Sequence, residues 1–331
     1  MQASNMAVEA SASPGLISNQ LKQNHLVCEM LAEKFRDTPP RAIMMVGRGT
    51  SDHAGVFAKY LIEITLGIPV FAAAPSIAGV YKSTLNLKDC LVIAISQSGK
   101  SPDLINQVEL AIEGGATCIA LVNKTDSPLA ELADVVVPLG MGEEKAVAAT
   151  KSYLASLSAI CQLVAHWKQD HSLLNALETL PEQMQNALSV APKLTLEDIR
   201  DVAHCVVLGR GFGYAISREI ALKMKEVLGL HAEAFSSAEF LHGPVTLLEK
   251  RMAVVNVSIK DESYQTHQSQ LEDVRKRGGR VIDLTIGEDV HPRLQALVIM
   301  QRFYLDIEAV AVQMGLQPDS PPGLKKVTET V

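Results

Sequence analysis

Short apolar runs alternate with longer amphipathic segments along the whole 331-residue chain. Continuous apolar runs such as 42–46 (AIMMV) and 91–95 (LVIAI) are typical of strands that are buried on both faces. Segments such as 16–36 and 214–228 have the periodicity of amphipathic helices. Because strands that alternate with helices favour parallel sheets, the pattern predicts an α/β protein.

The same pattern predicts the remaining elements. Further strands are predicted at 70–73, 117–122, 134–138, 204–208, 231–236, 253–258 and 280–284. Further helices are predicted from residue 50 to about 65 and at 104–114, 144–166, 172–190, 195–202 and 292–314.

One unit of this pattern occurs twice. A strand followed by Gly-Arg-Gly and a helix is found at Gly47-Arg48-Gly49 and again about 162 residues later at Gly209-Arg210-Gly211. The repeat predicts an internal duplication, with two doubly wound parallel-sheet subdomains. We expect a flexible N-terminal arm at 1–15, a first subdomain with linking helices at 16–190, a second at 191–316, and a polar, proline-containing tail at 317–331.

Composition narrows the class of protein. The chain is 47% hydrophobic and 20% charged, with a net charge of −7 and no dense Lys/Arg block, so no nucleic-acid partner is expected. Its five cysteines form no CxxC and suit reduced thiols in a cytosolic protein. The N-terminus lacks the features of a signal peptide, and no apolar run is long enough for a bilayer, so we expect a cytoplasmic protein without membrane contact.

Two polar loops are candidate anion sites. Ser96-Gln97-Ser98-Gly99-Lys100-Ser101 follows a predicted buried strand and precedes a helix, where backbone N–H groups favour an anion and hydroxyls can bind phosphate. The alternative is that these serines only cap the helix. Gly47-Arg48-Gly49-Thr50-Ser51 has the same context, and two such loops at one sheet edge favour a binding site. Neither has the spacing of a Walker A loop.

Cofactor motifs are absent from the sequence. After Gly209, Gly211 and Gly213, position 214 is Tyr, so the dinucleotide fingerprint is incomplete and no nicotinamide cofactor is expected. The histidines have no ligand-like spacing, and we predict neither a catalytic metal nor another cofactor.

The second half contains candidate acid–base residues. Glu219, Lys223 and Glu226 lie at i, i+4 and i+7 and so share one helix face beside an apolar stripe. Charges on a largely buried helix need partners or a task, whereas the alternative is an ordinary surface Glu–Lys pair. His242 precedes Gly243-Pro244 and can act as acid or base, or simply cap or pack.

Several segments together resemble the SIS (sugar isomerase) family, in particular the isomerase domain of glucosamine-6-phosphate synthase and stand-alone SIS-type glucosamine-6-phosphate deaminases. The resemblance runs from about residue 40 to the end. The matching segments are 49–51 (GTS), 96–99 (SQSG), 148–151 (AATK), 219–226 (EIALKMKE), 231–234 (HAEA), 239–244 (EFLHGP) and 324–328 (LKKVT).

The resemblance implies a role for each matching residue. The C1–C2 proton shuttle falls on Glu226, sugar-ring opening on His242 donated by the second subunit of a homodimer, and the lysine that meets the open-chain sugar on Lys326, with Lys325 adjacent. The implied phosphate and sugar contacts are Arg48, Gly49, Thr50, Ser51, Ser96, Gln97, Ser98, Ser101, Val147, Ala149, Glu219 and Lys223.

Departures from the family bear on the substrate. The synthase has Cys where this chain has Arg48 and Ser where it has Ala149. It also carries a glutaminase domain, whereas only about 40 residues precede the first strand here. Without an ammonia supply the same chemistry should release ammonia, which predicts glucosamine 6-phosphate plus water giving fructose 6-phosphate plus ammonia.

Other functions remain open. Within the family, a fructosamine-6-phosphate deglycase or a galactosamine-6-phosphate deaminase/isomerase would use the same residues. A non-catalytic sugar-phosphate sensor is the alternative from another class. SIS-containing regulators typically carry a helix-turn-helix domain, for which we see no room, and a sensor would not need Glu226, His242 and Lys326 together.

Overall fold

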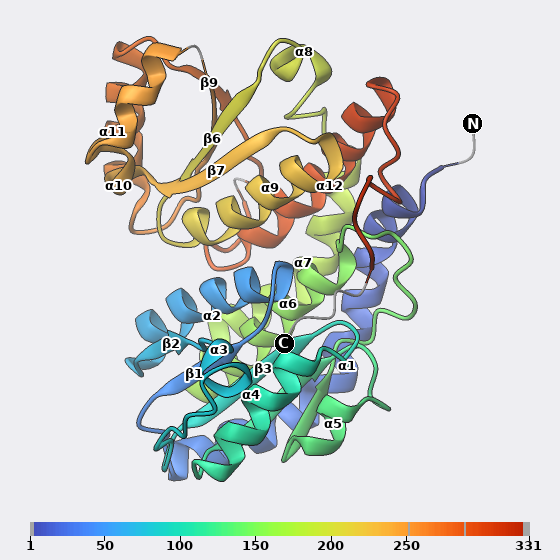
Figure 1. The fold of residues 1–331 in the computed structure, drawn as a ribbon, viewed down its shortest axis with the longest axis vertical. Helices are drawn as coiled ribbons and strands as arrows, with labels where there is room; N and C mark the ends of the chain where they lie inside the picture. Colours follow the sequence, from blue (N-terminus) through green and yellow to red (C-terminus); the bar gives the residue numbers. More distant parts are fainter. Residues whose placement is uncertain (1–2, 251, 288, 327–331) are drawn as a thin grey trace. The chain divides into compact units, whose positions relative to one another are not determined.

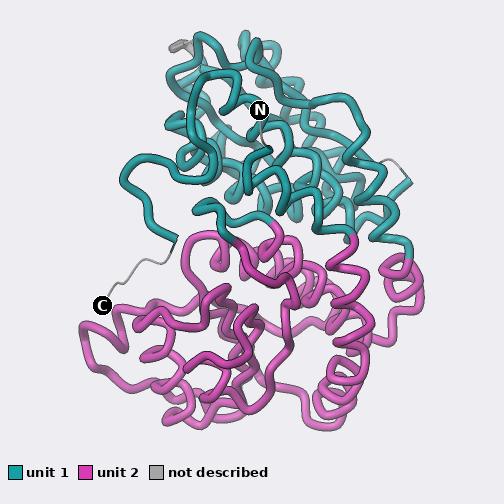
Figure 2. Tube along the Cα trace, turned by 90° about the vertical axis from the view of Figure 1, so that its right-hand side faces the viewer, with its two compact units in different colours: residues 1–14, 145–150, 179–326 teal, residues 15–144, 151–178, 327–331 magenta. Residues whose placement is uncertain are grey.

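The computed structural model describes residues 3–250, 252–287 and 289–326, and it contains two parallel sheets (Figure 1). These residues form two compact units, coloured separately in Figure 2. The α2 unit comprises residues 15–144 and 151–178, and it is named after its helix α2 (Thr50–Leu66). The α9 unit comprises residues 3–14, 145–150 and the described part of 179–326, and it is named after its helix α9 (Phe212–Leu228).

The α2 unit is built on a five-stranded sheet of order β2-β1-β3-β4-β5, in which all strands are parallel. The strands are β1 (Ile43–Val46), β2 (Val70–Ala72), β3 (Leu91–Ser96), β4 (Thr117–Val122) and β5 (Val135–Pro138). Besides α2, this unit has the helices α3 (Ser76–Gly79), α4 (Pro102–Glu113), α5 (Pro128–Leu132) and α6 (Lys151–Lys168).

Helices cover both faces of this sheet, because alternate strand residues point to opposite sides. Met44 and Val92 lie in the core cluster that includes residues of α4 and α5. Met45 faces the other way and lies against Gly55 of α2. Burial on both faces explains why β3 is apolar almost throughout.

The α9 unit is built on a four-stranded parallel sheet of order β7-β6-β8-β9. Its strands are β6 (His204–Gly209), β7 (His231–Ser236), β8 (Ala253–Val257) and β9 (Arg280–Asp283). Besides α9 it has α8 (Leu196–Ile199), α10 (Ser237–Leu241), the 3-10 helix η1 (Pro244–Lys250), α11 (Tyr264–Lys276) and α12 (Gln295–Gln313). The predicted fold class, α/β with two doubly wound parallel sheets, is confirmed.

The two sheets repeat one register. Ile43 of β1 pairs with Val70 of β2, and Cys205 of β6 pairs with Ala232 of β7, so each partner lies 27 positions further along. The central pair of strands follows the same rule, since β1 pairs with β3 as β6 pairs with β8. The structure therefore supports the duplication that the repeated Gly-Arg-Gly predicts.

Glycines set the same turn in both halves. Gly49 precedes α2 with φ 51° and ψ −123°, and Gly211 precedes α9 with φ 55° and ψ −123°, a region that L side chains rarely adopt. Both helices have 17 residues and end at a left-handed glycine, Gly67 or Gly229. Each helix therefore starts and stops for the same backbone reason.

The N-terminal residues differ from the expectation of a flexible arm at 1–15. Helix α1 runs from Asn5 to Asp37 and continues through Pro14. Its first turn is capped from far along the chain, since the backbone N–H groups of Asn5 and Met6 donate to the carboxylate of Asp319. This tertiary capping orders a segment whose composition alone suggested a loose arm.

A second difference concerns residues 144–150, where a continuous helix to 166 was expected. Helix α6 begins only at Lys151, because Glu144 folds back as a cap and accepts from the backbone N–H and the hydroxyl of Ser152 at 3.1 and 2.8 Å. Helix α7 (His171–Leu188) follows it.

Helix α11 was not expected from the sequence.

Within the part of the chain that the structure describes, no helix combines the length and the apolar character needed to cross a membrane. The five cysteines are buried and free, as the scattered spacing suggested. Burial raises the pKa of the Cys28 and Cys205 thiols to about 12.

Candidate functional site

The loop at residues 96–101 joins β3 to α4 and presents hydroxyl groups. The Ser96 hydroxyl accepts from the Gly99 N–H at 3.0 Å, and the Ser98 hydroxyl accepts from the Lys100 N–H at 3.3 Å. Ser101 occupies the N-cap of α4, but its side chain makes no cap hydrogen bond. That finding weakens the interpretation of Ser101 as a capping serine and leaves its hydroxyl available to a ligand.

Gly99 allows this loop to fold tightly. Its φ of 64° lies in the left-handed region, and a Cβ at this position would meet the Ser127 hydroxyl at 2.0 Å. No other residue type fits here without displacing Ser127. The glycine therefore sets the path of the backbone between the hydroxyls of Ser98 and Ser101.

Arg48 connects the second polar loop to the first. Its guanidinium Nε donates to Asp103 Oδ2 at 2.6 Å, and Asp103 lies in the first turn of α4. Asp103 is 1% exposed whereas Arg48 is 51% exposed, so the guanidinium is anchored from the inside and open to solvent outside. Thr50 and Ser51 begin α2 and are half-buried. The two predicted anion loops thus form one polar edge of the sheet in the α2 unit.

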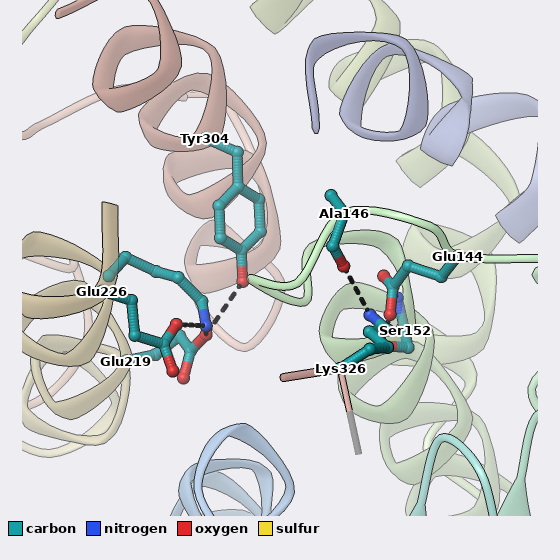
Figure 3. Close-up of polar contacts among 8 residues, drawn as sticks. Glu144, Ala146, Ser152, Glu219, Glu226, Tyr304 and Lys326 are labelled. Carbon is teal, nitrogen blue, oxygen red and sulfur yellow. Dashed lines mark hydrogen bonds and ion pairs between the residues drawn. The ribbon is translucent and has the colours of Figure 1, made fainter. Parts of the chain in front are cut away.

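Helix α9 carries a buried charge cluster, drawn in Figure 3. Lys223 Nζ lies 2.6 Å from Glu226 Oε2 and 3.1 Å from Glu219 Oε1. The side chains of Lys223 and Glu219 are 1% and 0% exposed, and that of Glu226 is 22% exposed. Among the three residues, Glu226 is therefore the one that a small molecule can reach.

The charges of this cluster depend on one another. Burial by itself lowers the pKa of Lys223, but the carboxylates of Glu219 and Glu226 outweigh it, so the net direction is upward and the ammonium form is kept. Two carboxylates and one ammonium give the cluster a net negative charge. A carboxylate held next to an ammonium can take up a proton and return it, which is what a general base must do.

Tyr304 of α12 extends the cluster. Its hydroxyl donates to Glu219 Oε1 at 3.5 Å, and Figure 3 shows the ring directed toward that carboxylate. Tyr304 is fully buried. Nothing in the sequence singles it out, because α9 and α12 are far apart in the chain and only packing brings them together.

The C-terminal tail places its lysine on another part of the α9 unit. Lys326 Nζ donates to the backbone carbonyl of Ala146 at 2.8 Å, as Figure 3 shows. Lys326 is half-buried whereas the adjacent Lys325 is exposed, which favours Lys326 as the functional tail lysine. Val147 and Ala149, both half-buried, belong to the same 145–150 segment as Ala146.

His242 lies at the C-terminal end of α10. It follows the last residue of α10, its side chain is exposed, and its backbone N–H donates to the Glu239 carbonyl at 3.0 Å. An exposed imidazole is accessible to a second molecule, which is the setting that the family resemblance implies for it. Among residues 3–250, 252–287 and 289–326, no group of three or more side chains is arranged to hold a metal ion.

The predicted residues therefore fall into separate groups. The structure brings the loops around Arg48 and Ser98 together in the α2 unit, and Glu219, Lys223 and Glu226 together on α9. The sequence missed Asp103, Tyr304, Asp319 and Glu9, and of these only Asp103 had a local signal, an acidic residue in the first turn after a polar loop.

Comparison with known proteins identifies the family to which this chain belongs. A model of the SIS domain matches residues 38–166 and 198–299. A glutamine–fructose-6-phosphate aminotransferase [isomerizing] from Methanothermobacter thermautotrophicus is 35% identical over 302 residues, which cover 86% of this chain and 51% of the relative. The chain thus spans about half the length of the curated relatives that it matches.

Solved structures share the whole fold. A protein from Silicibacter pomeroyi DSS-3 with the provisional name phosphosugar isomerase is 33% identical, has a TM-score of 0.89, and the match covers 96% of this chain and 100% of that one. A glucosamine-6-phosphate deaminase from Thermotoga maritima has a TM-score of 0.80 over 99% of this chain and 100% of its own. Its 20% identity limits that comparison to the fold.

Proposed function

Because this chain belongs to the SIS domain family, we propose that it is a glucosamine-6-phosphate deaminase, which converts glucosamine 6-phosphate and water into fructose 6-phosphate and ammonia. The observation that carries the proposal is the Glu219–Lys223–Glu226 cluster, which leaves one carboxylate accessible beside a buried ammonium. The aminotransferase relative is named for fructose 6-phosphate and for an isomerising reaction, which supports sugar-phosphate chemistry in the proposal.

The substrate phosphate is proposed to bind the loops of the α2 unit. Hydroxyls of Ser96, Ser98 and Ser101, the amide of Gln97 and the start of α4 supply hydrogen-bond donors to a dianion. Thr50 and Ser51 add hydroxyls at the start of α2. Val147 and Ala149 are proposed to contact the sugar.

The reaction is proposed to begin with opening of the sugar ring, in which His242 moves a proton between O1 and O5. Glu226 then removes the proton from C2 and returns it at C1, which converts the amino aldose into a 2-imine. Lys223 is proposed to hold the Glu226 carboxylate in place, since its ammonium lies 2.6 Å from that carboxylate.

Ammonia leaves in the last steps. The amine of Lys326 is proposed to add to the C2 imine and displace ammonia, after which water hydrolyses the lysine adduct and releases fructose 6-phosphate. When no ammonia donor supplies the site, dilution of ammonia in water draws the reaction in this direction.

A homodimer with shared sites is part of the proposal. His242 follows α10 and is exposed in the single chain, which suits a histidine that serves the site of a second copy. No residue is proposed to hold a metal or an organic cofactor, because each step uses only acid–base and amine chemistry.

Two substrates and one function of another class compete with this proposal. Arg48 is half-exposed beside the phosphate loop and favours an additional anionic group, as in a fructosamine 6-phosphate derived from an amino acid. Galactosamine 6-phosphate differs from the proposed substrate only at one hydroxyl. A sensor would use the same loops and would bind without turnover.

The test is ammonia release from purified protein supplied with glucosamine 6-phosphate, galactosamine 6-phosphate or a fructosamine 6-phosphate, with fructose 6-phosphate assayed in parallel. We expect ammonia and fructose 6-phosphate in equal amounts from glucosamine 6-phosphate. Turnover of only one of the other two substrates would transfer the assignment to that enzyme. Tight binding without any product would establish the sensor instead.

A further inference from the structure

We propose that Asp319 and Glu9 are positioning residues for Lys326, and that they act through the first turns of α1 and the 145–150 segment. The inference rests on the proposed function, in which the Lys326 amine acts at C2 of the sugar. All of these residues belong to the α9 unit.

Asp319 ties the tail to the start of α1. Its carboxylate accepts from the backbone N–H of Asn5 at 2.8 Å, from the Asn5 side-chain amide at 3.0 Å and from the Met6 N–H at 2.8 Å. The first N–H groups of a helix have no partner within the helix, and a negative charge at this end also matches the helix dipole. Both carboxylate oxygens of Asp319 accept, and an amide at position 319 could replace only one of them as an acceptor.

Asp319 also ties the tail to the 145–150 segment. Its backbone carbonyl accepts from the Val147 N–H at 3.0 Å. One residue thus binds α1 with its side chain and the 145–150 segment with its main chain. The two contacts fix the start of the tail at two points.

Glu9 supports the same segment from α1. Its buried carboxylate accepts from the N–H groups of Lys145 and Ala146, the latter at 3.3 Å. The carbonyl of Ala146 in turn accepts from Lys326 Nζ at 2.8 Å. Ala146 is therefore held by Glu9 through its N–H and holds Lys326 through its carbonyl.

The sequence between these anchors explains why they are needed. Lys326 follows Asp319 through a segment without helix or strand that includes Gly323, and such a segment has many alternative conformations. Fixing Asp319 on α1 and Ala146 on Glu9 restricts both the start of the tail and the acceptor for its lysine. A small displacement of a reacting group can lower a rate about a hundredfold.

Ser4 provides a matched control. Its hydroxyl donates to Glu308 of α12 at 2.6 Å and accepts from the Ala7 N–H, so it secures the same helix start without touching the tail. Ser4→Ala removes one capping hydrogen bond of the same turn and keeps the contacts of Asp319 with Asn5 and Met6 and that of Lys326 with Ala146.

The experiment compares Asp319→Asn, Glu9→Gln and Ser4→Ala in the full chain. For ammonia release we expect kcat to fall about tenfold to hundredfold in the first two variants, with KM changed less than about twofold, and Ser4→Ala to resemble the wild type. Borohydride trapping of fructose 6-phosphate on Lys326, read by mass spectrometry, should slow in parallel. Asp319→Glu, which keeps the carboxylate, should recover part of the rate.

Equal kcat values in Asp319→Asn, Glu9→Gln and Ser4→Ala would overturn the inference, as would a rise in KM without a fall in kcat. Circular dichroism and thermal melting identify a variant that fails to fold, and the comparison with Ser4→Ala then uses the other of Asp319→Asn and Glu9→Gln. A wild type that releases no ammonia would count against the proposed function alone. In that case hydrogen exchange at residues 145–150 decides: faster exchange in Asp319→Asn and Glu9→Gln than in Ser4→Ala supports the anchoring, and equal exchange rejects it.

Discussion

Helices α2 and α9 have the same length and both begin after and end at a glycine, but their side chains differ in polarity. At matching positions of the duplicated pattern, α2 has apolar side chains and α9 has charged ones. The pairs are Phe57 and Glu219, Leu61 and Lys223, and Ile64 and Glu226. In α2 the first two of these positions are part of the apolar core, whereas in α9 they bury an ion pair.

The loops after the equivalent strands β3 and β8 also differ, but here the loop with charged side chains that contact one another lies in the α9 unit and the loop with hydroxyls lies in the α2 unit. After β3 the loop is SQSGKS and presents hydroxyls beside a left-handed glycine. After β8 it is SIKDES, where the Asp261 carboxylate accepts from the N–H and the hydroxyl of Ser263 at 2.8 and 2.6 Å. Glu262 is engaged by Arg293 in two hydrogen bonds, and this contact lowers its pKa to about 2.

The two units therefore share a backbone arrangement and differ in their side chains. The α2 unit has a hydroxyl-bearing loop after β3 and an apolar helix α2. The α9 unit has a loop after β8 whose carboxylates make internal hydrogen bonds, and a charged helix α9. Because the backbone is shared, paired substitutions at matching positions separate the effect of the side chain from that of the frame.

The greatest loss of activity is expected at the accessible carboxylate. Glu226→Gln should lower kcat for ammonia release about 10³-fold, because a general base contributes factors of that order. The matching substitution Ile64→Gln on α2, at an exposed position, should leave kcat unchanged. Steady-state rates of the two variants measure the difference, and comparable losses would refute the assignment of the base to α9.

The buried ammonium should matter next, for stability. Lys223→Met leaves Glu219 buried without its cation and should lower the free energy of unfolding by about 3–5 kcal/mol. Leu61→Met at the matching position preserves volume and should cost less than about 1.5 kcal/mol. Urea unfolding compares them, and a Lys223→Met variant as stable as Leu61→Met would show that the pair contributes nothing net.

A third difference between the halves should appear on acidification. Burial lowers the pKa of His267 to about 4, and the nearby Arg210 and Arg275 add to this effect while Asp283 opposes it. The matching residue in the α2 unit is Ile105, which does not titrate. A histidine in the unfolded chain titrates near pH 6.5, so neutral His267 makes its full contribution to the free energy of unfolding above that pH. That contribution is lost as the pH falls toward 4, which lowers the free energy of unfolding by about 3 kcal/mol.

The check is the unfolding free energy of the wild type and His267→Gln at pH 7, 5.5 and 4. The variant cannot bind that proton, so its stability should fall less over this range. His267 accepts or donates at both ring nitrogens, to Ser237 and Asn256 at 2.8 Å each, so the two proteins should also differ at pH 7. Parallel curves would exclude His267 as the titrating group.

The most modest change concerns the anion loops. Ser98→Ala removes one hydroxyl proposed to bind phosphate and should raise KM about tenfold, the value for one hydrogen bond to a charged group. Lys260→Ala at the matching position after β8 should leave KM unchanged. If Lys260→Ala raised KM and Ser98→Ala did not, the loop of the α9 unit would be the phosphate site.

The order of strands and helices and the duplication could be predicted from the sequence, because they depend on local signals. Continuous apolar runs identified strands such as β3. The repeated Gly-Arg-Gly identified the duplication, since a turn of φ near 50° with ψ −123° favours glycine. Helical periodicity placed Glu219, Lys223 and Glu226 on one face, and the family resemblance from the motifs is confirmed by the domain match.

The rest depends on contacts across the chain. In the first turns of α1, Met6 and Ala10 are buried and Asp319, Glu9 and Ser4 make hydrogen bonds, and the composition of this segment revealed neither the burial nor these bonds. Glu144 ends the expected long helix by capping α6 from outside, which no periodicity reveals. The predicted subdomain boundaries and the roles of the individual site residues stay predictions.

The interleaving of the two units bears on biosynthesis. Within the described residues the chain passes between the units four times, at 14, 144, 150 and 178, so neither unit is one continuous segment. The first turn of α1 is synthesised well before its cap at Asp319, which lies 314 positions further along the chain than Asn5. Loop closure over such a distance is slow, so this end of α1 is secured only after most of both units has been synthesised. A nascent chain would therefore expose this end of α1 to chaperones and proteases until Asp319 has been added.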